Sequence, residues 1–190
     1  MIDLVDKINL LKKIPRMGWL EAGIGLSEVE DVAQHSFITS VVTLLLSDRV
    51  EEEIDCERAL RMAVVHDWGE SLMGDFSERL TSLIGKEAKE RMEEKALEKL
   101  LSESSTDKET YLELWREYSE NESMEARLVY VADRLSILIE AGHLFEKGER
   151  SEKLRRIWKS VRDELKTYRE DFPLLEDLLQ DLDKNYPSDV

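Results

Sequence analysis

The sequence has little cysteine and no long apolar run, and each shortage excludes a class of protein. Cys56 is the single cysteine, so the chain cannot form an intramolecular disulfide and a reducing compartment is favoured. The longest apolar-looking run, from Val41 to Leu46, is far shorter than the ~20 residues that span a bilayer. The N-terminal segment MIDLVDKINLLKKI mixes acids with apolar residues, unlike the basic-then-apolar order of a signal peptide. We therefore expect a cytoplasmic protein with no membrane attachment.

The chain also has far fewer basic than acidic residues. The chain has 27 lysines and arginines against 43 acids, which gives a formal net charge of −16. Proteins that bind DNA or RNA polymers gain most of that affinity by neutralising phosphates with a basic face. No basic block rises above the acidic background, so we expect neither a nucleic-acid polymer nor an anionic membrane as a partner. A small anionic substrate fits only if the site supplies positive charge locally.

Proline and glycine, the residues that interrupt helices, number only 3 and 8 in 190 residues. Charged residues make up 37% of the chain and hydrophobic residues 42%, a composition that favours helices around one core. Apolar residues recur with helical spacing, and no useful strand pattern is present, so the sequence predicts a single all-α domain over residues 1–190 with roughly seven helices. The predicted helices cover residues 2–14, 30–49, 55–67, 86–103, 107–119, 123–147, 151–170 and 174–184, and residues 16–29 are predicted to form a loop.

Four polar residues stand where these helices look apolar. His35 lies in QHSFITSVVTLLL, His66 and Asp67 end RALRMAVVHD, and Asp133 interrupts ARLVYVADRLSILIEA. Each has an ordinary explanation, since a lone histidine is commonly a satisfied core or surface residue and a helical aspartate usually faces solvent or a neighbouring helix. Burying polar groups is costly unless something satisfies them, and one bound metal ion would satisfy all four. His143, near a predicted helix end, is not part of this pattern.

Two imidazoles and two carboxylates from three helices form a mixed nitrogen and oxygen donor set. Such a set suits Mn, Fe, Co, Ni or Zn better than Ca. Four protein ligands leave one or two positions of a five- or six-coordinate ion open, and open positions indicate catalysis rather than a closed structural site. The alternative is a helical binding module in which the metal only ties three helices together.

The order H…HD…D formed by His35, His66-Asp67 and Asp133 resembles the HD-domain phosphohydrolase superfamily. The segments AQHSF, HDWGESLMGD and ADRLSILIEA, with IPRMGW near the N-terminus, are similar to its 5′-deoxynucleotidase branch (YfbR-like). The resemblance covers roughly residues 10–145 and implies an HD-domain helical bundle, with the helices of residues 151–184 packed on it. It also implies His35, His66, Asp67 and Asp133 as ligands of a divalent metal.

The resemblance implies roles for four further residues. Glu70 would handle the proton of the attacking water, and Asp75 would act in catalysis and contact the substrate. Arg16 would hold the phosphate, and Trp19 would press on the sugar to disfavour a 2′-hydroxyl. In parts of the family the arginine and tryptophan are adjacent, whereas two residues separate them here, so packing of a loop on the first helix is the alternative for both.

These residues predict a metal-dependent phosphohydrolase that acts on nucleoside 5′-monophosphates, with deoxyribonucleotides as the expected substrates. A nucleoside triphosphate, a cyclic nucleotide or a pyrophosphate is the alternative within the superfamily. A triphosphate would need more cations than Arg16 near the metal, and the sequence shows no obvious cluster of them. The resemblance also suggests a homodimer. A leucine stripe offers either a dimer interface or packing onto the chain's own core: Leu174, Leu175, Leu178, Leu179 and Leu182.

Overall fold

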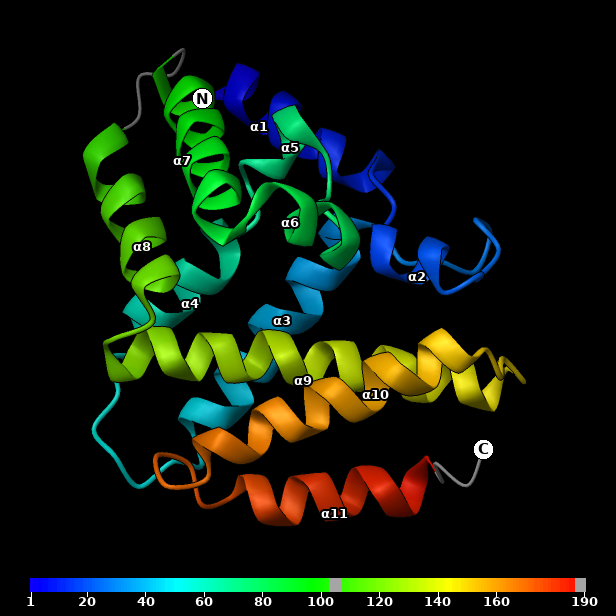
Figure 1. Cartoon of the computed structure of the whole chain (residues 1–190). Helices are drawn as coiled ribbons and strands as arrows, with labels where there is room; N and C mark the ends of the chain where they lie inside the picture. Colours follow the sequence, from blue (N-terminus) through cyan, green and yellow to red (C-terminus); the bar gives the residue numbers. More distant parts are fainter. Residues whose placement is uncertain (103–106, 187–190) are drawn as a thin grey trace.

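The computed structural model describes residues 1–102 and 107–186 (Figure 1). Helices make up the regular structure of these residues, and no strand forms among them, which confirms the predicted all-α class. The last residue of the helix predicted over 86–103 lies outside the described part of the chain. No described helix combines the length and the apolar character needed to cross a membrane.

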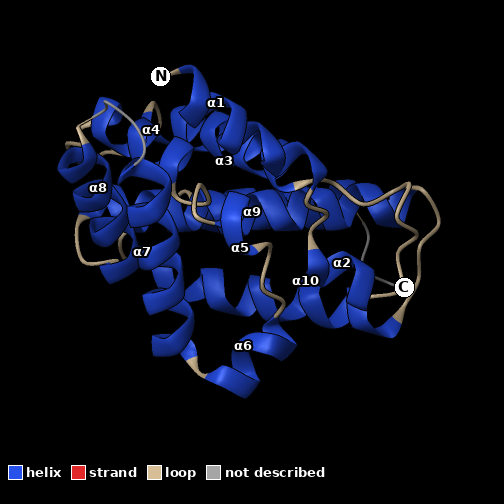
Figure 2. Ribbon diagram, turned by 90° about the horizontal axis from the view of Figure 1, so that it is seen from above, coloured by secondary structure: helices blue, strands red, loops and turns tan. Residues whose placement is uncertain are grey.

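Three helices cross at the centre of the molecule: α3 (Val32–Ser47), α4 (Cys56–Val65) and α9 (Met124–Glu146). The longest of them, α9, runs through the middle of Figures 1 and 2 and buries side chains around most of its circumference. A helix that is apolar nearly all round is typical of the centre of a bundle.

Outer helices cover this centre from two sides (Figure 1). On one side, α7 (Lys86–Ser102) and α8 (Lys108–Glu120) pack against each other, and α8 also contacts α4 and α9. On the other side, α10 (Glu152–Leu165) and α11 (Leu175–Asn185) pack on α9, joined by a 3-10 turn at Lys166–Tyr168.

The leucine stripe near the C-terminus belongs to the core of the chain. Leu175 and Leu179 are buried, and the remaining three leucines pack against the same core: Leu174, Leu178 and Leu182. Of the two interpretations that the sequence left open for this stripe, packing onto the chain's own core is therefore the correct one.

The first segment of the chain is α1 (Ile2–Ile8), which continues as a 3-10 helix over Asn9–Lys13. Pro15 follows and forms an isolated antiparallel bridge with Asp31. Beside this bridge the N–H of Arg16 donates to the carbonyl oxygen of Glu30 at 3.0 Å. The bridge therefore holds Arg16 next to the start of α3.

Three short helices lie where the sequence predicts a loop or a break: α2 (Met17–Glu21), α5 (Glu70–Met73) and α6 (Glu78–Ile84). None is longer than 7 residues, which is too short for apolar periodicity to reveal. The predicted loop over 16–29 is wrong at α2, and the bundle has more helices than the predicted seven or so.

The buried face of α3 is not the one that apolar spacing alone suggests. Phe37, Leu44 and Leu45 recur with helical spacing, but their side chains are 66%, 43% and 53% exposed. The face of α3 that packs inward carries a different set: Val32, His35, Thr39, Thr43 and Leu46. Polar groups therefore line the contact with α9, where Oγ1 of Thr39 lies 3.2 Å from Oγ of Ser136.

Candidate active site

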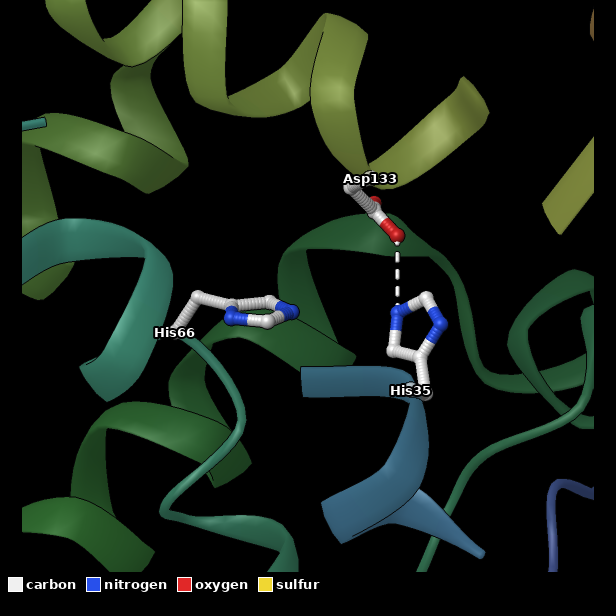
Figure 3. Close-up of side chains that lie close together, drawn as sticks. All are labelled: His35, His66 and Asp133. Atoms are coloured by element: carbon white, nitrogen blue, oxygen red, sulfur yellow. Dashed lines mark ion pairs between the residues drawn. The ribbon is translucent and has the colours of Figure 1, made fainter. Parts of the chain in front are cut away.

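Polar side chains from the three central helices meet at one buried point (Figure 3). His35 stands in the first turn of α3, where the side chain of Asp31 accepts a backbone N–H and caps the helix. His66 follows the last residue of α4, and Asp133 lies midway along α9. One ligand atom from each of the three lies within 4.8 Å of the others, and all three residues are buried.

Asp67, in the turn after α4, is the fourth predicted donor and reaches the same point. Its Oδ2 lies 3.1 Å from Nε2 of His66 and 3.9 Å from Nε2 of His35. A contact of 2.9 Å joins Nε2 of His35 to Oδ1 of Asp133. The structure thus brings all four predicted metal ligands together, three of them as a compact cluster.

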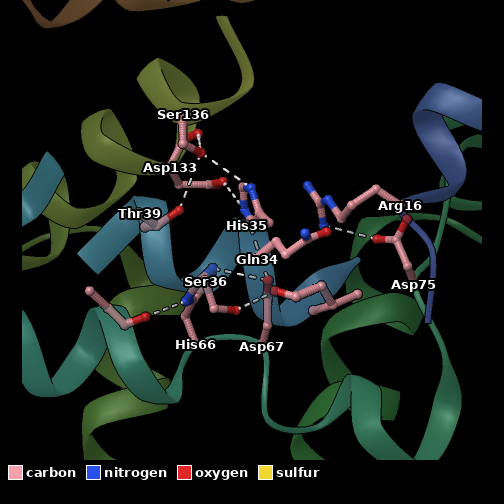
Figure 4. A network of polar contacts seen from close by, with 12 residues as sticks. Arg16, Gln34, His35, Ser36, Thr39, His66, Asp67, Asp75, Asp133 and Ser136 are labelled. Atoms are coloured by element: carbon pink, nitrogen blue, oxygen red, sulfur yellow. Dashed lines mark hydrogen bonds and ion pairs between the residues drawn. The ribbon is translucent and has the colours of Figure 1, made fainter. Parts of the chain in front are cut away.

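Both imidazoles have Nδ1 engaged away from this point (Figure 4). Nδ1 of His66 lies 2.8 Å from the carbonyl oxygen of Ala63, so this nitrogen carries a proton. Nδ1 of His35 lies 3.2 Å from Oγ of Ser136, whose hydroxyl donates to the carbonyl oxygen of Asp133 at 2.7 Å. With Nδ1 protonated, Nε2 of each ring offers its lone pair to a metal ion.

Two buried atoms at this point, Nε2 of His66 and Oδ2 of Asp67, make no hydrogen bond with the described residues. Burial opposes ionisation of Asp133, but Arg134 and the imidazoles outweigh it and hold its pKa well below the ordinary value. Burial likewise opposes ionisation of Asp67, whose pKa the imidazoles and Arg16 nevertheless lower. Two ionised carboxylates and two imidazole nitrogens form a donor set that fits a divalent transition metal.

Arg16 and Asp75, both predicted to contact the substrate, contact each other. Nη1 of Arg16 donates to Oδ1 of Asp75 at 3.0 Å, and the backbone N–H of Met17 donates to Oδ2. Burial lowers the pKa of the Arg16 guanidinium, but the surrounding carboxylates raise it by more, so the group stays charged. Both residues line the same cavity as the metal ligands.

Trp19 also lines this cavity, although it is only 3% exposed and belongs to the hydrophobic core. Its indole N–H donates to Oε1 of Glu30 at 2.9 Å. The same oxygen lies 3.9 Å from Nδ1 of His35. Glu30 therefore links the predicted sugar-contacting residue to a predicted metal ligand, a connection that the sequence analysis missed.

Glu70 begins α5 and is 4% exposed, with Oε2 buried and free of hydrogen bonds to the described residues. Burial raises the pKa of Glu70 well above its ordinary value, and the charges of Asp67 and Asp75 raise it further. The charges of Arg16 and Lys89 act in the opposite direction. Glu70 is thus a buried carboxyl group with a raised proton affinity beside the metal ligands.

The cavity has a volume of about 850 Å³, a size typical of small-molecule sites. Its wall includes three residues that the sequence analysis missed: Lys89, Tyr118 and Arg134. In the sequence, Lys89 looks like one of many surface charges on its helix. Tyr118 and Arg134 carry no signal of their own, although the position of Arg134 next to Asp133 could have marked it.

A close approach of α7 brings Lys89 to the site. Gly69 packs against this helix so tightly that a Cβ there would lie 3.0 Å from the carbonyl oxygen of Glu93. Nζ of Lys89 pairs with Oε1 of Glu93 at 3.2 Å, and the two side chains are 30% and 17% exposed. The pair therefore stands at the cavity wall beside Glu70, and not on the outer face of the helix.

The all-α bundle and the two histidines and two aspartates around one buried point define the class of this protein, which is the HD domain family. The chain matches that family over residues 8–171 and belongs to it. The 5′-deoxynucleotidase HDDC2 of Danio rerio is 32% identical over 151 residues, which cover 78% of this chain and 71% of that protein. The protein of the same name from Bos taurus is 31% identical over 143 residues, which cover 74% of this chain and 66% of that relative, just under two thirds. A solved structure of a Pyrococcus horikoshii protein is 31% identical, with a TM-score of 0.81, and the match covers 97% of this chain and 99% of that one.

Proposed function

We propose that this protein is a metal-dependent phosphohydrolase that removes phosphate from deoxynucleoside 5′-monophosphates. Relatives in the same family bear the name 5′-deoxynucleotidase. The observation that carries the proposal is the cavity, because the metal donors, the acid Glu70 and the cation Arg16 all line it. Phosphoester hydrolysis needs these three elements together: an activated nucleophile, a proton acceptor and neutralisation of phosphate charge.

His35, His66, Asp67 and Asp133 would hold the metal, and their donor set suits Co, Mn, Fe, Ni or Zn. When bound, such an ion polarises a phosphoryl oxygen and lowers the pKa of water at its open position. The protein's part is orientation. The bonds from Nδ1 of His66 to Ala63 and of His35 to Ser136 turn each ring so that Nε2 faces the centre.

Glu70 would accept the proton of the attacking water. Its unbonded Oε2 and its raised pKa support this role, because a carboxylate with higher proton affinity is a stronger base. Asp75, the other predicted catalytic acid, has both oxygens engaged by Arg16 and Met17. We therefore assign proton transfer to Glu70, and we assign Asp75 to orienting Arg16 and contacting the substrate.

Arg16 would hold the phosphate. Its guanidinium lines the cavity and offers charge-assisted and bidentate hydrogen bonds. Local charge of this kind offsets the net charge of −16, because distant surface acids are screened over a Debye length of ~8 Å. Trp19, which lines the cavity and belongs to the hydrophobic core, would contact the sugar and disfavour a 2′-hydroxyl.

A nucleotide with a longer phosphate chain is the second candidate, because two further lysines, Lys86 and Lys153, line the cavity. Each of the three cavity lysines already has a carboxylate 2.6–3.4 Å from Nζ, from Glu90, Glu93 or Glu21. Cations that are neutralised by their own partners leave little charge for three phosphates. The monophosphate is therefore the better supported substrate.

A nucleotide panel tests the proposal. The protein is incubated with dAMP, AMP, dATP, a cyclic nucleotide or pyrophosphate, with Mn²⁺ or Co²⁺ and again after EDTA. Nucleosides, nucleotides and phosphates are separated by chromatography, because opening a cyclic phosphodiester releases no inorganic phosphate. We expect the fastest hydrolysis for dAMP and none after chelation. Hydrolysis of dATP or the cyclic nucleotide in preference to dAMP would replace the proposed substrate. Metal binding without hydrolysis of any of them would favour the non-catalytic binding module.

We further propose that residues 1–190 form one HD domain that acts in the cytoplasm as a homodimer. The single cysteine, Cys56, supports a reducing compartment. Because the C-terminal leucines are used by the core, the dimer needs another surface, and the exposed Phe37, Leu44 and Leu45 of α3 offer one. Light scattering during gel filtration would give the mass of two chains, and the mass of one chain would contradict the dimer.

A further inference from the structure

The two oxygens of Asp133 have different partners. Oδ1 lies 2.9 Å from Nε2 of His35 and faces the other predicted ligands (Figure 3). Oδ2 accepts a hydrogen bond from the hydroxyl of Tyr118 at 3.2 Å and lies 3.2 Å from Nη2 of Arg134. A carboxylate oxygen can only accept, so the tyrosine hydroxyl must be the donor.

Tyr118 also contacts a second predicted ligand. Its ring packs against the imidazole of His66 in a T-shaped arrangement, with ring centroids 5.4 Å apart. It comes from the last turn of α8, whereas His66 follows α4 and Asp133 lies on α9. One side chain from outside the ligand set thus touches two ligands that belong to two different helices.

Arg134 differs from Tyr118 in this respect. Its guanidinium stacks on Tyr130, 4.7 Å from the ring centroid, and its Nε lies 3.8 Å from Oε2 of Glu164. These contacts tie it to the wall formed by α9 and α10. Tyr118 is the residue whose described polar and ring contacts are both with predicted ligands.

We propose that Tyr118 is a positioning residue of the metal centre. Its hydroxyl fixes Oδ2 of Asp133 and its ring restrains the imidazole of His66, so that Oδ1 and Nε2 are in place before an ion binds. This inference rests on the metal site of the proposed function. Groups that orient metal ligands typically contribute about 10- to 100-fold to metal affinity, because an unrestrained ligand must be ordered when the ion binds.

Tyr118→Phe is the sharpest variant, since it removes the hydroxyl and keeps the ring. Tyr118→Leu removes both contacts. Tyr111→Phe is the matched control: Tyr111 lies two turns earlier on α8 and packs on Trp68, with ring centroids 5.3 Å apart. It is not among the residues that line the cavity.

The experiment titrates Co²⁺ into chelated protein and measures the dissociation constant by calorimetry and the visible spectrum of the bound ion. Thermal unfolding of the metal-free proteins is recorded in parallel. We expect Tyr118→Phe to weaken Co²⁺ binding about 10-fold or more and to change the spectrum. Tyr118→Leu should weaken binding further, while Tyr111→Phe should match the unmodified protein.

Unchanged affinity and spectrum in Tyr118→Phe would overturn the inference, including the case in which the metal-free variant is less stable, because that result would make Tyr118 a packing residue only. Failure of the unmodified protein to bind Co²⁺ would instead contradict the proposed function, and this inference with it. The two failures are distinguished by the titration of the unmodified protein.

Discussion

Replacement of Glu70 by glutamine tests the proton-transfer step without removing a predicted metal ligand. The amide keeps the shape of the side chain and loses its basicity, and Glu70 is not part of the compact His35, His66 and Asp133 cluster. Metal affinity and nucleotide binding should therefore change little. Turnover should fall by ~10²–10⁴-fold, the usual size of a general acid–base contribution.

The same substitution should stabilise the metal-free protein near neutral pH. Burial raises the pKa of Glu70 well above its ordinary value, so the folded state binds this proton more tightly than the unfolded state. That contribution is fully present below the unfolded-state pKa of about 4.3 and is lost as pH rises through the folded-state pKa. Between these two pKa values the unmodified protein loses up to about 1.4 kcal/mol of stability per pH unit, and the glutamine variant does not.

The assay combines phosphate release by the metal-loaded protein with thermal unfolding of the chelated protein. For a chain of this size, 1 kcal/mol moves the midpoint by about 2–4 °C. The unfolding midpoint of Glu70→Gln should therefore exceed that of the unmodified protein by more at pH 7 than at pH 4. Glu113→Gln, an exposed position on α8, is the control. Turnover at the unmodified rate would refute the assignment and move proton transfer to Asp75, whereas loss of the metal would make Glu70 a ligand.

Three further substitutions test the substrate side of the cavity. Arg16→Ala should raise KM for dAMP about ten- to a hundredfold with the metal retained, since a hydrogen bond to a charged group contributes roughly 1.5–3 kcal/mol. Unchanged kcat and KM would leave Arg16 as a structural partner of Asp75 only. Lys89→Met should move the acidic limb of the pH profile of kcat/KM to higher pH, because the charge of Lys89 lowers the pKa of Glu70. A profile identical to that of Lys95→Met, an exposed position on the same helix, would argue against this. Trp19→Phe keeps an aromatic ring in the core but loses the hydrogen bond to Glu30. It should lower the ratio of the hydrolysis rate with dAMP to the rate with AMP. An unchanged ratio would make Trp19 a core residue only.

The long helices could be predicted from the sequence, because apolar spacing persists over many turns in segments such as those of α4, α7 and α9. The short helices α2, α5 and α6 could not, since each depends on its neighbours rather than on its own pattern. The exposed Phe37, Leu44 and Leu45 show a second limit. Spacing alone does not decide which face of a helix turns inward when polar groups such as His35 and Thr39 have partners on α9.

For the site, the sequence indicated the four predicted ligands because they interrupt or end apolar helices, and the resemblance to the family indicated Glu70, which follows the histidine-aspartate pair. It did not indicate Lys89, because a lysine with glutamates around it looks like any solvated helix face. Only the contact between Gly69 and the backbone of Glu93 turns that face into a cavity wall. The mutual pairing of Arg16 and Asp75 was missed for a similar reason, since 59 positions separate them and the fold brings them together.

The proposed activity requires a bound metal ion, so phosphate release from dAMP should depend on the metal content of the protein. Protein freed of metal by chelation is titrated with Mn²⁺, and the initial rate of phosphate release is measured against the ion bound per chain. We expect no release from the chelated protein and a rate that rises with occupancy and saturates at one ion per chain. Hydrolysis of dAMP at the full rate by the metal-free protein would contradict the proposed metal dependence.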